Sequence, residues 1–291
     1  DELQLVPGGQ QVRVRSLHAQ NQAVQHTGAG RRVAIGLVGI DRQKIERGQW
    51  LAAPNAASAG SDRLDMTLTL WAGEAKPLRA GTPVHVHLGA ATTLGTVAVL
   101  DRVALMPGET GLVQLVLRQS IGAWHGDRVV LRDASATRTM AGGQLLDPFG
   151  PVRYRRTPQR LAELSALALP DPTARLHRLL AASPGGLDLR RFGIGQGAAP
   201  PTLPPQTLRH NSARGDWALG VDAVARAQQA TLDALAAFHA RNPDELGPDT
   251  ARLRRLAAPR LPAPLWQALV ARLTAQGRIA LQGPVAHLPT H

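Results

Sequence analysis

The chain has 291 residues, too many for one ordinary domain, and 44% of them are hydrophobic, which is enough to form more than one core. It contains no cysteine, which excludes disulfide scaffolds, thiolate metal sites and thiol nucleophiles, and it has no apolar run long enough to span a membrane. The formal net charge is +12, and residues 151–291 carry most of it with 18 arginines, no lysine and nine acidic residues. A basic, arginine-rich half indicates a nucleic-acid partner, although a general arginine bias of the genome would produce the same composition.

Residues 1–150 have the pattern of an all-β region. The turn signals between the expected strands include Pro7-Gly8-Gly9, Pro107-Gly108 and Gly142-Gly143. Alternation of apolar and polar residues predicts strands at 12–14, 33–37, 66–71, 84–88, 96–100, 112–117 and 128–132. Many short strands at this spacing favour a barrel or a sandwich, and the small, polar run 52–61 is expected to link two β modules.

Residues 151–291 change to helical periodicity. Helices are expected from Thr157-Pro158, from Asp171-Pro172, and over 222–239, 250–256 and 264–276, followed by strands at 278–282 and 285–288. Three helices followed by a β-hairpin is the order of a winged helix. A weaker copy of this order at 157–220, with a strand at Trp217-Ala218-Leu219, indicates an internal repeat.

No segment carries a convincing catalytic or cofactor motif. There is no Gly-Lys-Ser/Thr sequence to hold phosphates, and Gly193, Gly195 and Gly197 fit a flexible loop better than a dinucleotide site. His85 and His87 share one strand face, but without a third ligand a solvated or partner-facing edge is the better interpretation than a metal site. No metal is therefore expected.

Two aspartates lie near the ends of a predicted strand. Asp127 and Asp133 are interpreted as turn or salt-bridge residues, because no carboxylate pair forms a recognisable acid–base arrangement.

Two groups of arginines are candidate RNA contacts. Arg31 and Arg32 open a predicted strand, where they either protect a sheet edge by their charge or bind an anion. The second group lies on and just after a short helix of the second winged helix, which is either a solvated face or a surface that approaches a nucleic-acid backbone. Its members are Arg252, Arg254, Arg255 and Arg260.

Several segments together resemble the selenocysteine-specific elongation factor, a specialised relative of elongation factor Tu. The run VRVRSLHAQNQ, with its HAQNQ sequence, and the run AGRRVAIGLVGID resemble that factor's second domain. Its third domain and its second winged helix are matched by Arg63–Trp71, Val84–Val97, Met106–Leu117, Gly126–Pro148, Leu235–Leu256 and Leu273–His291. The resemblance extends over nearly the whole chain.

The resemblance implies a multidomain fold class, with all-β translation-factor barrels followed by α+β winged-helix domains. The expected domains are a partial domain II barrel at 1–56, a domain III barrel at 57–150, and winged helices at 151–220 and 221–291. The GTPase domain, the start of domain II and the last two winged helices of the family are missing, so the chain is expected to be a fragment.

The implied function is that of a part of a factor that delivers selenocysteinyl-tRNA to the ribosome at UGA codons. The barrels would contact the tRNA, and the winged helices would lead to the end that binds the messenger-RNA hairpin. Arg32 matches the arginine of the family's AG-x-R segment, which lines the selenocysteine pocket. The chain by itself is expected to be no enzyme and to hold no cofactor, since GTP and Mg²⁺ belong to the family's GTPase domain. A cytoplasmic monomer without membrane contact is expected.

A second hypothesis from a different class is a winged-helix DNA-binding regulator with a β-rich N-terminal effector domain. The basic helical half supports it. The order of the segments between Arg63 and Pro148 opposes it, because a regulator would have no need of them.

Overall fold

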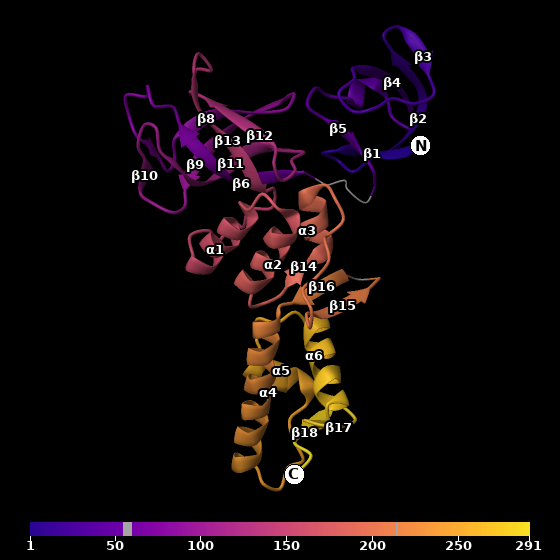
Figure 1. Ribbon diagram of the computed structural model, residues 1–291, viewed down its shortest axis with the longest axis vertical. Coiled ribbons are helices and arrows are strands. Elements are labelled where there is room, and N and C mark those ends of the chain that lie inside the picture. Colours follow the sequence, from indigo (N-terminus) through magenta and orange to yellow (C-terminus); the bar gives the residue numbers. More distant parts are fainter. Residues whose placement is uncertain (55–59, 214) are drawn as a thin grey trace. The chain divides into compact units, whose positions relative to one another are not determined.

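A computed structural model describes residues 1–54, 60–213 and 215–291. The chain divides into two compact units, one formed by Asp1–Leu164 with Gly193–Ala199 and the other by Ser165–Phe192 with Pro200–His291. The first is rich in strands and the second in helices (Figure 1). Residues 55–59 of the linker predicted at 52–61 lie outside the described residues. Within the described residues, no helix is both long and apolar enough to cross a membrane.

The N-terminal sheet has five strands in the order β3-β2-β1-β5, and β4 pairs with β2 from Arg13 to Ala19. These strands are β1 (Glu2–Val6), β2 (Gln11–Ala19), β3 (Gln22–Val24), β4 (Val33–Val38) and β5 (Trp50–Ala52). A short 3-10 helix, η1 (Arg42–Lys44), precedes β5. The Pro7-Gly8-Gly9 turn joins β1 to β2 as predicted, and the positive φ angles of Gly8 and Gly9 explain the choice of glycine there.

The second sheet closes into a barrel with the strand order β11-β6-β13-β12-β8-β9. Its strands are β6 (Ser61–Leu70), β8 (Pro83–Leu88), β9 (Ala91–Val99), β11 (Thr110–Ile121), β12 (Arg128–Arg132) and β13 (Thr139–Asp147). Two short strands, β7 (Leu78–Arg79) and β10 (Ala104–Leu105), pair with each other.

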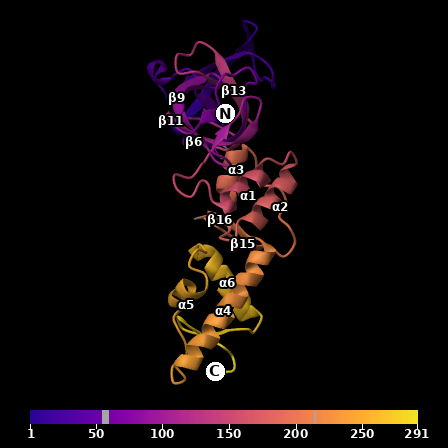
Figure 2. The same cartoon turned by 90° about the vertical axis from the view of Figure 1, so that its left-hand side faces the viewer.

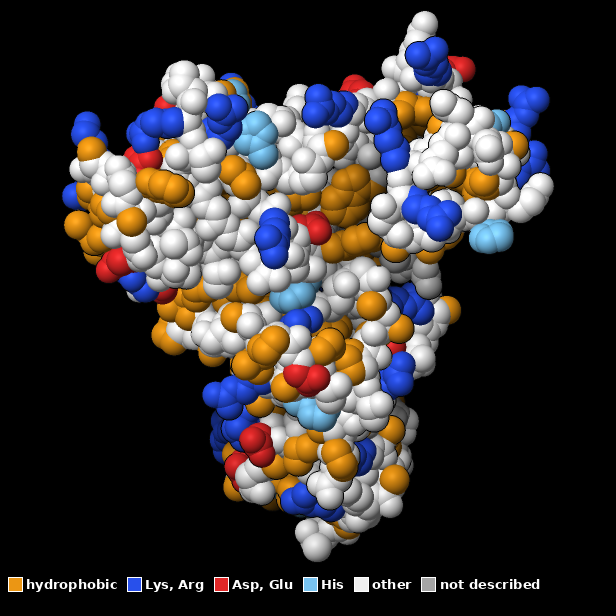
Figure 3. Space-filling view, turned by 45° about the horizontal axis from the view of Figure 1, so that its top comes forward, with side chains coloured by type: hydrophobic (Ala, Val, Ile, Leu, Met, Phe, Trp, Pro, Cys, Tyr) orange, Lys and Arg blue, Asp and Glu red, His pale blue; other side chains and the backbone are white. Residues whose placement is uncertain are grey.

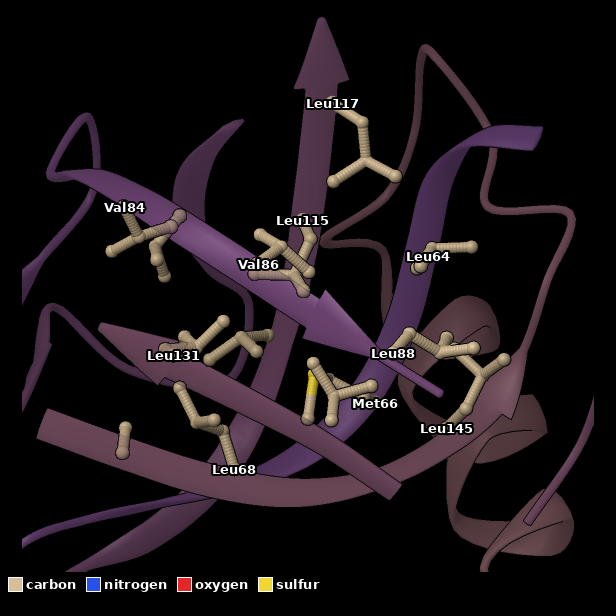
Figure 4. Close-up of a cluster of buried hydrophobic side chains, with 14 of the residues drawn as sticks. Leu64, Met66, Leu68, Val84, Val86, Leu88, Leu115, Leu117, Leu131 and Leu145 are labelled. Carbon is tan, nitrogen blue, oxygen red and sulfur yellow. The ribbon is translucent and has the colours of Figure 1, made fainter. Parts of the chain in front are cut away.

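The barrel interior is filled by alternate residues of its strands, as the period of two predicts. Met66 and Leu68 of β6 meet Val86 of β8 and Leu131 of β12 in this core (Figure 4). All four side chains are fully buried, so the apolar face of each strand forms one continuous aliphatic core.

The glycine pair Gly142-Gly143 lies inside β13, so the turn predicted there is wrong. The physical reason is close backbone packing, because a Cβ on Gly143 would lie 1.9 Å from the carbonyl oxygen of Thr67 on the paired strand β6. A Cβ on Gly142 would meet nothing nearer than the Val129 carbonyl oxygen at 3.5 Å. Close packing therefore requires glycine at position 143 but not at position 142.

We expect Gly143→Ala to lower the free energy of unfolding of the barrel by about 1–3 kcal/mol, because the added methyl group forces β6 and β13 apart. Gly142→Ala is the matched control and should change it by less than about 0.5 kcal/mol. Urea unfolding of both variants measures the difference. Equal stability of the two variants would contradict the steric explanation.

A buried ion-pair network connects the barrel strands β6 and β13 to the segment after the barrel. Arg160 donates hydrogen bonds to Asp65 Oδ2 at 2.6 Å and to Asp147 Oδ2 at 2.6 Å. Asp65 is fully buried and also accepts a hydrogen bond from the side-chain amide of Gln114 at 2.8 Å. Every charge in this group therefore has an opposite partner, which a buried charge requires.

The segment expected to form the first winged helix contains a three-stranded sheet in the order β14-β16-β15. Its elements are α1 (Pro158–Leu167), α2 (Pro172–Ala182), β14 (Leu187–Asp188), α3 (Leu189–Gln196), β15 (Leu208–Ser212) and β16 (Gly215–Leu219). Asp171 caps α2 by accepting a hydrogen bond from the Ala174 amide at 2.6 Å, as its sequence predicts. The predicted strand at 217–219 is confirmed within β16.

The loop predicted around Gly193 and Gly195 is wrong, because both residues belong to α3. A Cβ on Gly195 would touch Phe149 and Pro148 at 3.4–3.5 Å, so this glycine permits close packing. The glycines lie in the C-terminal half of the helix, where the helix dipole repels phosphate.

The second winged helix follows the predicted order of three helices and a hairpin (Figure 2). Its elements are α4 (Val221–Arg241), α5 (Thr250–Ala257), α6 (Ala263–Ala275), β17 (Ala280–Gln282) and β18 (Val285–His287). Leu235 of α4, Leu253 of α5 and Leu269 of α6 are fully buried in one core, which also includes Leu219 of β16. A barrel-containing sheet unit followed by winged-helix elements confirms the predicted fold class.

Candidate RNA-binding surfaces

The HAQNQ and AGRR segments come together at one end of the N-terminal sheet. Gln20 and Asn21 both have positive φ angles, 52° and 62°, and form the two-residue turn between β2 and β3. Val33, the first residue of β4, pairs with Ala19, the last residue of β2. Arg32 therefore lies directly before β4 and beside this turn, although no sequence periodicity predicted that the two would meet.

Arg31 and Arg32 are both exposed, and neither has a hydrogen bond or ion pair with any of the residues that the structure describes. Both guanidinium groups are free to bind an anion. Both residues precede β4, so strand alternation does not fix the directions of their side chains.

One apolar residue of β4 departs from the burial that the alternation at 33–37 would give. Val33 and Leu37 are half-buried as expected, but Ile35 is 37% exposed. The reason is that the sheet is open in the described residues, so no second layer covers this part of β4.

Helix α5 presents three of the four predicted winged-helix arginines. Leu253 anchors the helix in the core, and Arg252 and Arg255, one turn apart, are exposed while Arg254 is half-buried. The guanidinium carbon of Arg252 lies 5.3 Å from the centre of the Phe238 ring, a cation–π contact. None of the three forms an ion pair with a carboxylate among the described residues, so no acidic side chain there neutralises their charge.

Arg260, the fourth predicted arginine, lies in the loop after α5 and lines a cavity of about 270 Å³ within the helical unit. Arg226 of α4 lines the same cavity together with small side chains such as Ala223 and Ala230. No sequence pattern pointed to Arg226, because only the packing of α4 beside the segment after α5 brings these two arginines to one cavity. Basic side chains are spread over the visible face of the molecule and outnumber acidic ones (Figure 3).

The two barrel histidines each have a local partner. His85 Nε2 lies 3.2 Å from the Ala134 carbonyl oxygen, and His87 Nδ1 lies 3.1 Å from the Thr92 hydroxyl. Burial, Arg132 and His85 lower the pKa of His87, which favours its neutral form. Within the described ranges, no three His, Asp or Glu side chains are placed to hold a metal ion.

The turn interpretation of the two aspartates is confirmed. The Asp127 carboxylate accepts a hydrogen bond from the Trp124 amide at 2.8 Å, and Asp133 accepts them from the amides of Thr137 and Arg138. Burial raises the pKa of Asp133, but these bonds and one from the Thr137 hydroxyl outweigh it and lower the pKa to about 2. Asp133 therefore stays ionised and holds the turn between β12 and β13.

Two family models match this chain. Residues 65–152 match the selenocysteine-specific elongation factor β-barrel domain, and residues 232–288 match the winged helix of elongation factor SelB.

Proteins with the same description match over the whole chain. The selenocysteine-specific elongation factor of Desulfomicrobium baculatum is 30% identical over 300 residues, covering 100% of this chain and 47% of that protein. The corresponding factor of Escherichia coli K12 is 31% identical over 302 residues, covering 100% of this chain and 45% of that protein. The chain thus spans about half the length of the curated relatives that it matches.

A solved structure shows the same fold. The crystal structure of a bacterial selenocysteine-specific elongation factor, EF-Sec, aligns with a TM-score of 0.70 at 21% identity, covering 99% of this chain and 44% of that one.

Proposed function

Since the chain belongs to the family of selenocysteine-specific elongation factors, we propose that it contributes the tRNA-holding and linking parts of such a factor. The factor would deliver selenocysteinyl-tRNA to the ribosome at UGA codons. The observation that carries the proposal is the alignment of the whole chain, sheet unit and winged helices together, with factors of that description.

The N-terminal sheet and the barrel would contact the tRNA. Arg32, exposed and without an intramolecular partner among the described residues, is suited to pair with the selenolate of the aminoacyl group. The winged helices would lead to the part of the factor that binds the hairpin of a selenoprotein messenger RNA. GTP and Mg²⁺ would be bound by a GTPase domain, because no Gly-Lys-Ser/Thr sequence occurs in these 291 residues.

We further propose that the factor works in the cytoplasm as a monomer. The alternative of a DNA-binding regulator lacks support, because the matched barrel at 65–152 has a counterpart in elongation factors and needs no separate explanation.

Comparison of two nucleic acids tests the proposal. Fluorescence anisotropy would measure the affinity of the full chain for a UGA-decoding tRNA and for an unrelated DNA duplex of equal charge. We expect the tRNA to bind at least ten-fold more tightly. Tighter binding of the DNA would favour the regulator instead.

The winged-helix arginines give a prediction of their own. We expect Arg255→Gln to weaken RNA binding several-fold and to reduce the slope of log K against log salt by roughly one, because each neutralised phosphate releases counterions. Arg178→Gln is the matched control, since Arg178 is also an exposed helical arginine of the same unit. Equal slopes for both variants would mean that α5 makes no phosphate contact.

A further inference from the structure

Five residues between the barrel and α1 form an unusual surface loop, Val152-Arg153-Tyr154-Arg155-Arg156, here named the VRYRR loop. It holds three arginines and the chain's one tyrosine. Tyr154 is 80% exposed and Val152 is 66% exposed. The Tyr154 ring contributes little to the hydrophobic core, because it is so exposed to water. Core packing therefore does not explain why a large aromatic residue occupies this position.

The backbone presents Tyr154 in a fixed, strained conformation. Its φ angle is 61°, in the left-handed region that bulky residues rarely adopt. The Thr157 amide and hydroxyl both donate hydrogen bonds to the Tyr154 carbonyl oxygen, at 3.2 and 3.0 Å. Tyr154 is thus the first residue of a tight turn, closed by Thr157, that directly precedes α1.

The inward side of the loop is anchored to the barrel. Arg155 donates a hydrogen bond to Gln114 Oε1 at 3.1 Å, and the Gln114 amide donates to the Pro151 carbonyl oxygen at 3.1 Å. Gln114 is itself fully buried in the network around Asp65. A rigid support of this kind reduces the entropy lost when a ligand binds.

The outward arginines are not neutralised. Arg153 and Arg156 are exposed and have no carboxylate partner among the residues that the structure describes. Three carboxylates of the same unit, Asp65, Asp147 and Glu163, already form ion pairs with Arg160. Two exposed arginines without a carboxylate partner therefore lie on either side of the exposed Tyr154 in the sequence of the loop.

We propose that the VRYRR loop is an RNA contact, in which Arg153 and Arg156 pair with phosphates and Tyr154 stacks on an unpaired base. Guanidinium groups fit phosphate geometry, and stacking on an aromatic ring is the common way in which proteins hold unpaired bases. The inference rests on the proposed function, since tRNA supplies both a phosphate backbone and unpaired bases. It adds a binding surface outside the Arg32 and α5 groups.

The test measures binding of the full chain to an unacylated tRNA and to a blunt 12-bp RNA duplex that has no unpaired base. Tyr154→Ala should weaken tRNA binding about five-fold or more and leave duplex binding unchanged, whereas Tyr154→Phe should bind like the wild type. Arg153→Gln/Arg156→Gln should weaken both RNAs and reduce the salt slope by about 1.5–2. Arg178→Gln is the control for charge alone, and thermal melting of each variant checks that it folds.

The outcomes separate this inference from the proposed function. If the wild type binds tRNA and every loop variant binds it equally well, the loop proposal fails and the proposed function stands. If the wild type binds neither RNA, both fail. If Tyr154→Phe is as weak as Tyr154→Ala, the hydroxyl acts and stacking is refuted. If polyglutamate of equal charge displaces tRNA and Tyr154→Ala has no effect, the loop binds anions in general and the RNA assignment is overturned.

Discussion

Replacing Arg160 by methionine is expected to destabilise the barrel by about 3–5 kcal/mol, because it leaves the fully buried carboxylate of Asp65 without its opposite charge. Asp147 loses the same partner. Hydrogen exchange of barrel peptides at increasing urea concentration would measure the decrease in the free energy of unfolding of the barrel. Arg118→Met removes an exposed arginine of the same unit and should change stability by less than about 0.5 kcal/mol.

The loss should depend on pH with a defined sign. Burial already raises the pKa of Asp65, although Arg160 opposes it, and removal of Arg160 raises it further. A carboxyl group whose folded-state pKa lies above its unfolded value favours folding while it is protonated, and this contribution is lost as pH rises through the folded-state pKa. The Arg160→Met variant should therefore be closer to the wild type at pH 5 than at pH 8.

Asp65→Asn in the Arg160→Met background should recover part of the stability, because it removes the uncompensated charge. A loss below about 1 kcal/mol in Arg160→Met would show that the network is not needed for stability. A deficit that does not change with pH would show that the loss does not come from the charge of Asp65.

Much of the architecture could be predicted from local pattern, because barrel strands and amphipathic helices repeat with periods of two and 3.6. The alternation of Met66, Leu68 and Leu70 predicted β6, and Asp171-Pro172 predicted the start of α2. Pattern failed at Gly142-Gly143, since glycine has no side chain to show a period and its role is set by the carbonyl group of Thr67 on another strand.

The candidate sites were less predictable, because they depend on partners that are distant in sequence. Arg160 and Asp65 are 95 residues apart, and no local rule connects them. Arg226 and Arg260 share a cavity only because α4 packs beside the segment after α5. Resemblance identified Arg32 as a candidate, but strand alternation cannot give the direction of its side chain, because Arg32 precedes β4.

In a full-length factor that contains these 291 residues, Arg32→Ala is expected to weaken binding of selenocysteinyl-tRNA about ten- to a hundred-fold and of seryl-tRNA much less. A selenol ionises far more readily than a hydroxyl, so only selenocysteine offers an anion at neutral pH. A charge-assisted hydrogen bond contributes roughly 1.5–3 kcal/mol, which sets the expected range. Because Arg32 is exposed and lacks an intramolecular partner among the described residues, its removal should cost the fold little.

Arg31→Ala is the matched control for this experiment, because Arg31 adjoins Arg32, carries the same charge and is equally free of partners in the part of the chain that the structure describes. Arg32→Lys keeps the charge but removes the planar fork, and it should fall between the wild type and Arg32→Ala. Equal weakening of both tRNAs by Arg32→Ala would mean that Arg32 contacts only the tRNA backbone. No weakening of either would place Arg32 outside the aminoacyl pocket, and the turn formed by Gln20 and Asn21 beside it would then have no part in binding the amino acid.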